Sequence, residues 1–304
     1  MYDYGNARVA AARSRLLGRV ELQQLQDAAS PAAMLAILER FEDWRSITAE
    51  VASLAAPPSQ AIGAAIERHR ARRLAAPVRW YPSPIRELVE ALAMPLDVER
   101  LVAITRRLRA GEPSDQIGAA VPPGALLDAD AIGLLARATS LGYLLDRASA
   151  KGLLSRPGAR AVTRLAAAGA TAARIELAIV EAADDARLAR ASGPGEAARI
   201  VTELVVEERG ARTQAALDSK DAGAAMAALE ERNTTLARLD RRAALGRRDP
   251  LGIGAIVGYV AAVEAGAIRL RAVVARVAAG WPADVVAEYL VVGSSRRSVA
   301  VAAA

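Results

Sequence analysis

The sequence predicts an all-α protein, and three observations support this fold class. Alanine, leucine and arginine, which favour helices, dominate the 304 residues. Aromatic residues make up only 3% of the chain, too few for a typical β-sandwich or β-barrel, and alternating β-branched patterns are nearly absent. Proline and glycine divide the chain into segments of helical length.

The first predicted helix lies at the N-terminus. Val9, Leu16 and Val20 fall on one face, so we expect a helix that continues to about residue 20. Arg8, Arg15 and Arg19 stand about a quarter turn away. Such a stripe could contact a partner or lipid headgroups, and it could equally be a solvated helix face.

The clearest predicted helix lies near the C-terminus, between Gly252 and Ala279. Its apolar residues recur at steps of four and three, which places them on one seam: Ile256, Val260, Val263, Ala267, Leu270, Val274 and Val277. Glu264 and Arg271 share another face. A continuous helix here would be roughly 42 Å long. Gly280-Trp281-Pro282 should end it.

The chain also repeats itself internally. The segment around Gly111 recurs around Gly280, 169 residues later, and each copy has a long helix, a glycine terminator, a proline and an aspartate. A fainter copy surrounds Gly223, 57 residues before Gly280. The spacing exceeds that of common solenoid repeats. We therefore expect three related helical units, approximately 1–124, 125–222 and 223–304, closed around an axis as a collar or socket.

The composition excludes much active-site chemistry. Cysteine is absent, which removes disulfides, thiol nucleophiles and cysteine metal sites. His69 is the single histidine, and it lies in an arginine-rich run where we expect it to be solvated or paired rather than a general base. That run lacks the interleaved aromatic residues typical of single-stranded nucleic-acid binding. We predict no catalytic residue, no cofactor, no metal, no nucleic acid and no small-molecule substrate.

Two weaker motifs are best interpreted structurally. Asp184-Asp185 is only half of an aspartate-rich magnesium motif, because residue 188 is leucine, so a solvated helix face is the expected reading. The glycines Gly252, Gly254 and Gly258 do not follow a predicted strand, so they indicate close helix packing rather than a dinucleotide site.

Charge and hydropathy give an expectation for the compartment. The net charge is +6, and the N-terminus lacks a charged region followed by an apolar one. The longest uncharged apolar run near the end has 13 residues, from Leu251 to Val263, below the ~20 that span a bilayer. We expect a soluble, cytoplasmic chain.

Both ends of the chain carry a family signature. The N-terminal Tyr4-Gly5-Asn6-Ala7-Arg8-Val9, followed by Ser14-Arg15-Leu16-Leu17, resembles the start of the central-stalk subunit of V-type and A-type ATPases. That subunit is called C in bacterial and archaeal complexes and d in eukaryotes. The closing segment is also similar, in Asp249 to Gly254, Val257-Gly258-Tyr259, Glu264, Leu270-Arg271 and Gly280-Trp281-Pro282. The chain departs from the family at Gly266, where an acid is usual, and at Ile268-Arg269, where Arg-Asn is usual.

The resemblance implies three pseudo-symmetric helical domains that form a funnel-shaped socket. The socket would be a rotor part without an active site, on the cytoplasmic face of the membrane. Its partners would be the central axle, made of subunits D and F, and the membrane proteolipid ring. The candidate interface or signature residues are Tyr4, Asn6, Arg8, Arg15, Arg19, Glu264, Arg271 and Trp281.

Two other readings stay open. A stand-alone helical adaptor could bind a partner helix in a groove. A helical prenyl-diphosphate synthase is the second, although paired aspartate-rich motifs are missing. Neither the transported ion, H⁺ or Na⁺, nor the direction of the ATP reaction follows from the sequence.

Overall fold

The computed structural model describes residues 2–52, 56–218 and 224–282, and the side chains of 212–235 are left aside. Fourteen α-helices and no β-strand lie in these ranges, which confirms the all-α fold class. The helices are α1 (Asp3–Arg13), α2 (Arg19–Gln26), α3 (Pro31–Leu38), α4 (Glu42–Ala52), α5 (Pro58–Val78), α6 (Ile85–Arg109), α7 (Ser114–Ala120), α8 (Ala129–Ala136), α9 (Leu141–Ala150), α10 (Arg156–Ala167), α11 (Ala172–Ala191), α12 (Glu196–Asp218), α13 (Ala224–Arg248) and α14 (Ile253–Ala279).

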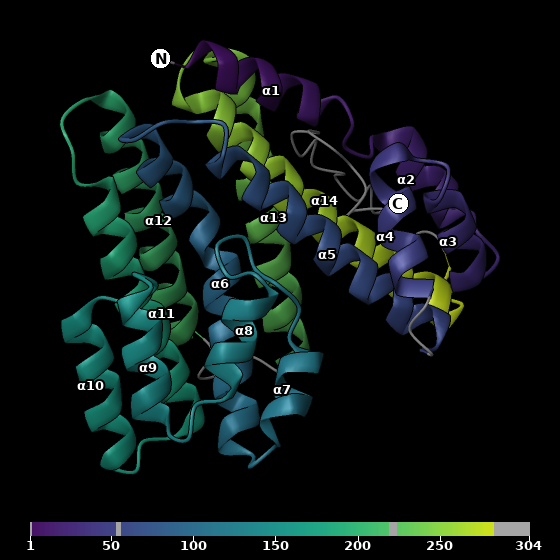
Figure 1. Ribbon diagram of the computed structural model, residues 1–304. Helices are drawn as coiled ribbons and strands as arrows, with labels where there is room; N and C mark the ends of the chain where they lie inside the picture. The colour runs from purple at the N-terminus through teal and green to yellow at the C-terminus, as the bar shows by residue number, and fades with distance from the viewer. Residues whose placement is uncertain (1, 53–55, 219–223, 283–304) are drawn as a thin grey trace, which may run out of the picture.

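The helices pack around three buried apolar clusters. One cluster joins α2 to α5 with the second half of α14, and another joins α6 to α11. The central cluster joins α1, the end of α5, the start of α6, α12 and the first half of α14. Figure 1 shows α5 and α14 running side by side between α1–α4 and the remaining helices. The long helices α5, α6 and α14 therefore each contribute to two clusters.

The prediction that the N-terminal helix continues to about residue 20 is wrong beyond residue 13. α1 ends at Arg13, and α2 begins at Arg19, after Gly18 in an extended conformation. The Gly18 N–H donates to Glu21 Oε2 at 2.9 Å, which starts a new helix. Val20 is consequently 66% exposed instead of buried. Arg8, Arg15 and Arg19 lie on different elements and do not form one stripe.

The prediction for α14 is confirmed at both its seam and its end. The seam residues from Ile256 to Val274 are buried or half-buried against α5 and its neighbours. Gly280 caps the helix with φ of 66°, in the left-handed region that favours glycine. α6 ends in the same way at Gly111, with φ of 75°.

The two ends share their hydrogen bonds as well. Glu112 N–H donates to Arg107 O and Trp281 N–H donates to Arg276 O, both at 3.1 Å. This structural likeness agrees with the repeat seen in the sequence. The third copy, around Gly223, and residues 283–304 lie outside the described residues, and the three-unit division stays a prediction.

The glycines at the start of α14 serve close packing, as predicted. A Cβ on Gly258 would lie 2.7 Å from the backbone nitrogen of Gly246 in α13, closer than real Cβ contacts allow. Beyond this contact, Arg269 Nη2 donates to both carboxylate oxygens of Asp240 at 2.6 and 2.7 Å. Arg269, one of the departures from the family pattern, therefore joins α14 to α13.

α14 is long and apolar enough to cross a membrane by length and composition alone, although 67% of its apolar window is buried inside the fold. A core helix of this kind meets the same criteria.

Candidate functional site

The two sequence signatures meet in space at Asn6. Its side chain is buried, and Nδ2 donates to Pro250 O at 3.2 Å and to Gly252 O at 3.1 Å. Its Oδ1 accepts a hydrogen bond of 2.6 Å from the hydroxyl of Tyr81. Asn6 thus connects α1, the loop before α14, and the segment after α5.

The residues around Asn6 explain the remaining signature positions. A Cβ on Gly5 would lie 2.1 Å from the Tyr81 ring, so this approach requires glycine. The carboxylate of Asp249 accepts from Gly252 N–H at 2.9 Å and from Gly254 N–H at 2.8 Å, which caps the start of α14. These signature residues therefore hold the N-terminal helix against the C-terminal one.

The other predicted residues at the ends of the chain do not gather at one place. Tyr4 is 64% exposed, and the Arg8 guanidinium carbon lies 4.8 Å from the centre of its ring. Arg15 lies 3.9 Å from a carboxylate oxygen of Asp43, and Arg19 is exposed at the start of α2. Trp281 is half-exposed, and its carbonyl oxygen accepts from Arg276 Nε at 2.7 Å.

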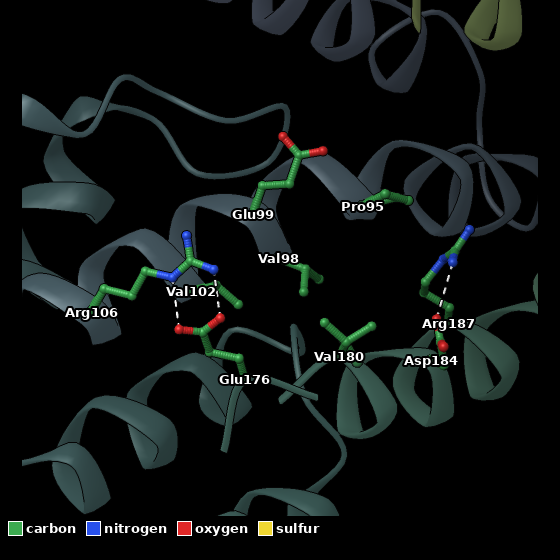
Figure 2. Close-up of a pocket in the computed structure, with 10 residues that line it drawn as sticks. Pro95, Val98, Glu99, Val102, Arg106, Glu176, Val180, Asp184 and Arg187 are labelled. Atoms are coloured by element: carbon green, nitrogen blue, oxygen red, sulfur yellow. Dashed lines mark hydrogen bonds and ion pairs between the residues drawn. The ribbon is translucent and has the colours of Figure 1, made fainter. Parts of the chain in front are cut away.

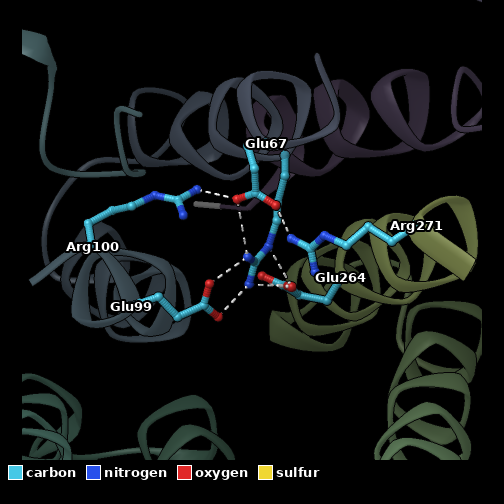
Figure 3. Close-up of polar contacts among 6 residues, drawn as sticks. Glu67, Glu99, Arg100, Glu264 and Arg271 are labelled. Atoms are coloured by element: carbon cyan, nitrogen blue, oxygen red, sulfur yellow. Dashed lines mark hydrogen bonds and ion pairs between the residues drawn. The ribbon is translucent and has the colours of Figure 1, made fainter. Parts of the chain in front are cut away.

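Glu264 and Arg271, by contrast, belong to a charged network between three long helices (Figure 3). At its centre, Arg70 of α5 donates to both Glu99 oxygens of α6 at 2.7 and 2.8 Å. Its Nε donates to Glu264 of α14 at 2.8 Å. Glu67, one turn earlier on α5, accepts from Arg100 of α6 and Arg271 of α14. We call these six residues the three-helix network.

Opposite charges act against the effect of burial on the pKa values of Arg70, Glu67 and Glu264. Burial lowers the pKa of Arg70, but Glu264 and Glu99 raise it by more, so the guanidinium stays charged. Burial raises the pKa of Glu67, but Arg271 and Arg100 outweigh it and the net shift is downward. Burial raises the pKa of Glu264, and Arg70 only partly offsets this shift. Arg70 is therefore the main group that favours the anionic form of Glu264.

A groove of about 400 Å³ lies between α6 and α11 (Figure 2). Its lining includes Pro95, Val98 and Val102 of α6 and Val180 of α11. Ion pairs flank the apolar side chains, with Arg106 donating to Glu176 at one end and Arg187 to Asp184 at the other. Glu99 stands at the rim, so the groove adjoins the three-helix network.

Asp184 has surroundings different from those expected. Asp184 is buried rather than solvated, because it accepts from Arg187 at 3.1 Å, while Asp185 is exposed and accepts from Arg209 at 3.2 Å. Among the described residues, no group of three or more Asp, Glu or His side chains is placed to hold a metal ion.

His69 is buried and paired, and pairing was one of the two surroundings expected for it. Its ring stacks on Trp44 with 4.0 Å between the ring centres, and its Nε2 accepts from Arg73 Nε at 3.4 Å. Burial, followed by the charge of Arg72, lowers its pKa to about 4. The imidazole is therefore a neutral packing group near pH 7.

Sequence reasoning missed Glu67, Arg70, Glu99 and Arg100, because the local sequence does not show which charged side chains are buried or which distant partners they meet. The shared face of Glu264 and Arg271 was the one available signal, and it did not identify the partners.

Comparison with known protein families assigns the chain to one of them. Residues 5–182, more than half of the chain, match the family described as ATP synthase (C/AC39) subunit. The chain belongs to this family. No curated protein matches the sequence. The C/AC39 family supplies subunits of V/A-type ATP synthases, so this chain is a subunit of such a complex and a peripheral part of a membrane-associated rotary ATPase.

Proposed function

We propose that this C/AC39 subunit is a non-catalytic rotor part, a funnel-shaped socket on the cytoplasmic face of the membrane. It joins the central axle, subunits D and F, to the proteolipid ring. Torque passes through it between ATP hydrolysis or synthesis and the transport of H⁺ or Na⁺. The family match over residues 5–182 is the observation that carries this proposal.

The three-helix network supports a mechanical role. A part that transmits torque must resist twisting, and close-packed interiors transmit strain. Arg70 ties α5 to α6 and α14 through bonds of 2.7 to 2.8 Å. Because each of these helices also enters two apolar clusters, a load on one cluster passes directly to another.

The groove between α6 and α11 is the proposed contact for an axle helix. Its valines offer an apolar surface, and the Arg106–Glu176 and Arg187–Asp184 pairs offer polar groups at its ends. Helix-in-groove docking uses this combination of an apolar floor and polar edges. The same groove would serve the partner helix of a stand-alone adaptor, which remains the second candidate function.

Co-purification tests the assignment. The tagged chain is expressed in its native cell, the membranes are solubilised gently, and the recovered proteins are identified by mass spectrometry. We expect the proteolipid ring, subunits D and F and the nucleotide-binding subunits. Recovery of the chain alone, under conditions that keep the rotary complex intact, would overturn the rotor role and favour the adaptor.

Val102→Arg tests the groove in the same preparation. The arginine should fill the groove and reduce the recovery of subunits D and F. Leu134→Arg is the matched control, because Leu134 is exposed on α8 and outside the groove lining. Thermal melting of each purified variant checks folding. Full recovery of D and F with a folded Val102→Arg variant would place the axle contact elsewhere.

A further inference from the structure

α10 presents a row of three arginines away from the fold. Arg156, Arg160 and Arg164 are spaced four residues apart, so they share one helix face, and all three are exposed. Ala159 and Val162 lie buried on the opposite side. We call the three residues the α10 arginine row. At ~1.5 Å per residue it is roughly 12 Å long.

Among the described residues, no acidic side chain pairs with this row. The chain holds six basic and no acidic residues between 147 and 175. None of the ion pairs or hydrogen bonds found among the described residues involves a guanidinium of the row. This contrasts with the arginines of the three-helix network, each of which pairs with a carboxylate.

The neighbouring helix adds an exposed aromatic residue. A Cβ on Gly142 would lie 3.4 Å from Thr163 Cγ2, so the first turn of α9 touches α10 beside Arg164. The next residue, Tyr143, is 42% exposed, and the Arg147 guanidinium carbon lies 4.7 Å from the centre of its ring. Figure 1 shows α10 at the outer edge of the molecule, with α9 next to it.

We propose that the α10 arginine row binds the phosphates of anionic lipid headgroups. Guanidinium groups match phosphate geometry, and exposed tyrosine with arginine is typical of residues at a membrane interface. A row of arginines without acidic neighbours on its helix is attracted to the negatively charged surface of an anionic bilayer. The subunit already belongs to a membrane-associated complex, so a lipid surface is present in its surroundings. The inference does not depend on the rotor role, because it concerns the isolated chain.

Vesicle flotation tests the proposal with the full-length chain. Vesicles of phosphatidylcholine are compared with vesicles that also contain phosphatidylglycerol, at low and at high salt. The triple variant R156Q/R160Q/R164Q keeps helix-compatible side chains. The control R40Q/R45Q/R79Q removes the same charge from exposed arginines elsewhere.

We expect the wild-type chain and the control to bind only the anionic vesicles, and salt to weaken this binding. The α10 variant should bind them at least about tenfold more weakly. If both variants lost the same affinity for anionic vesicles, net charge alone would explain the binding and the proposal would be overturned. Equal binding of the wild-type chain to neutral and anionic vesicles would also overturn it.

A photocrosslinker at Ala167, exposed at the end of α10, identifies the occupant in the cell. Lipid adducts are expected. Adducts to an acidic protein or to nucleic acid instead of lipid would overturn the proposal.

Discussion

At the scale of single residues, buried polar side chains show how this fold is specified. Asn6 and His69 are both enclosed, and each meets the cost of burial in a different way. Asn6 forms three hydrogen bonds, whereas His69 remains neutral and stacks on Trp44. Removing a hydrogen-bond partner of Asn6 leaves buried polar atoms without a hydrogen bond, and protonating His69 places a charge in the core.

Asn6→Ala should lower the free energy of unfolding by about 2–4 kcal/mol, because two carbonyls and the Tyr81 hydroxyl lose their partner. Tyr81→Phe should cost about 1–2 kcal/mol. The double variant should lose less free energy of unfolding than the sum of the two single losses, because both substitutions remove the same Asn6–Tyr81 hydrogen bond. Urea denaturation measures all three, and strict additivity would contradict the Asn6–Tyr81 bond.

His69 should make the chain less stable as the pH falls from 6.5 towards 4. Its folded pKa of about 4 lies below the ordinary 6.5, so over this range the unfolded chain binds a proton that the folded chain does not. The loss is about 3 kcal/mol and complete near pH 4, and His69 adds no pH dependence above 6.5.

His69→Phe keeps a ring against Trp44 and should remove that part of the pH dependence. Because the chain has one histidine, its proton NMR signal can be assigned without ambiguity. A titration midpoint near 6.5 in the folded protein would contradict the buried, neutral imidazole.

At the scale of helices, stability comes from side chains that join elements far apart in the sequence. Arg70 and Glu264 are separated by 194 residues, yet their side chains bond at 2.8 Å. Breaking a buried pair by removing one partner is costly, because the remaining charge stays buried. A paired charge at the surface contributes little.

Arg70→Met should therefore lower the free energy of unfolding by about 3–5 kcal/mol. Arg72→Met is the matched control on the same helix, because the Arg72 side chain is 51% exposed and pairs with Glu50, so it should cost at most about 1 kcal/mol. The Arg70 deficit should shrink on acidification, since protonated Glu264 no longer needs the guanidinium. Equal effects of the two substitutions in chemical denaturation would refute a structural role for the network.

The separation of interacting residues along the sequence explains which features could be predicted from it. Local periodicity was sufficient for α14 and for its glycine cap, because helix seams and caps depend on neighbouring residues. It failed at residues 14–18, where the apolar spacing continued although Gly18 and Glu21 begin a second helix. It also failed for Arg70 and Glu67, since a buried charge and a solvated one look alike until the distant partner is known.

At the scale of the whole molecule, α14 connects parts that would otherwise be separate. Its first half enters the central cluster, together with Val9 of α1, and its second half enters the cluster of α2 to α5. A change in packing at one end of α14 should therefore alter the stability of the other end, as expected of a rigid element that transmits strain.

Deleting residues 1–13 tests this connection and keeps Arg15 and Leu17, which contact α4 and the α2–α5 cluster directly. The deletion removes Asn6, the buried Val9 and the Arg13 bond of 2.8 Å to Ala243 O, so we expect the free energy of unfolding to fall by about 4 kcal/mol or more. Hydrogen exchange should quicken along the whole of α14 and also in α3 and α4, which lie outside the central cluster. Adding a peptide of residues 1–13 should restore the slower exchange. Faster exchange confined to the first half of α14 would mean that the two clusters unfold independently, and that the helix does not carry strain between them.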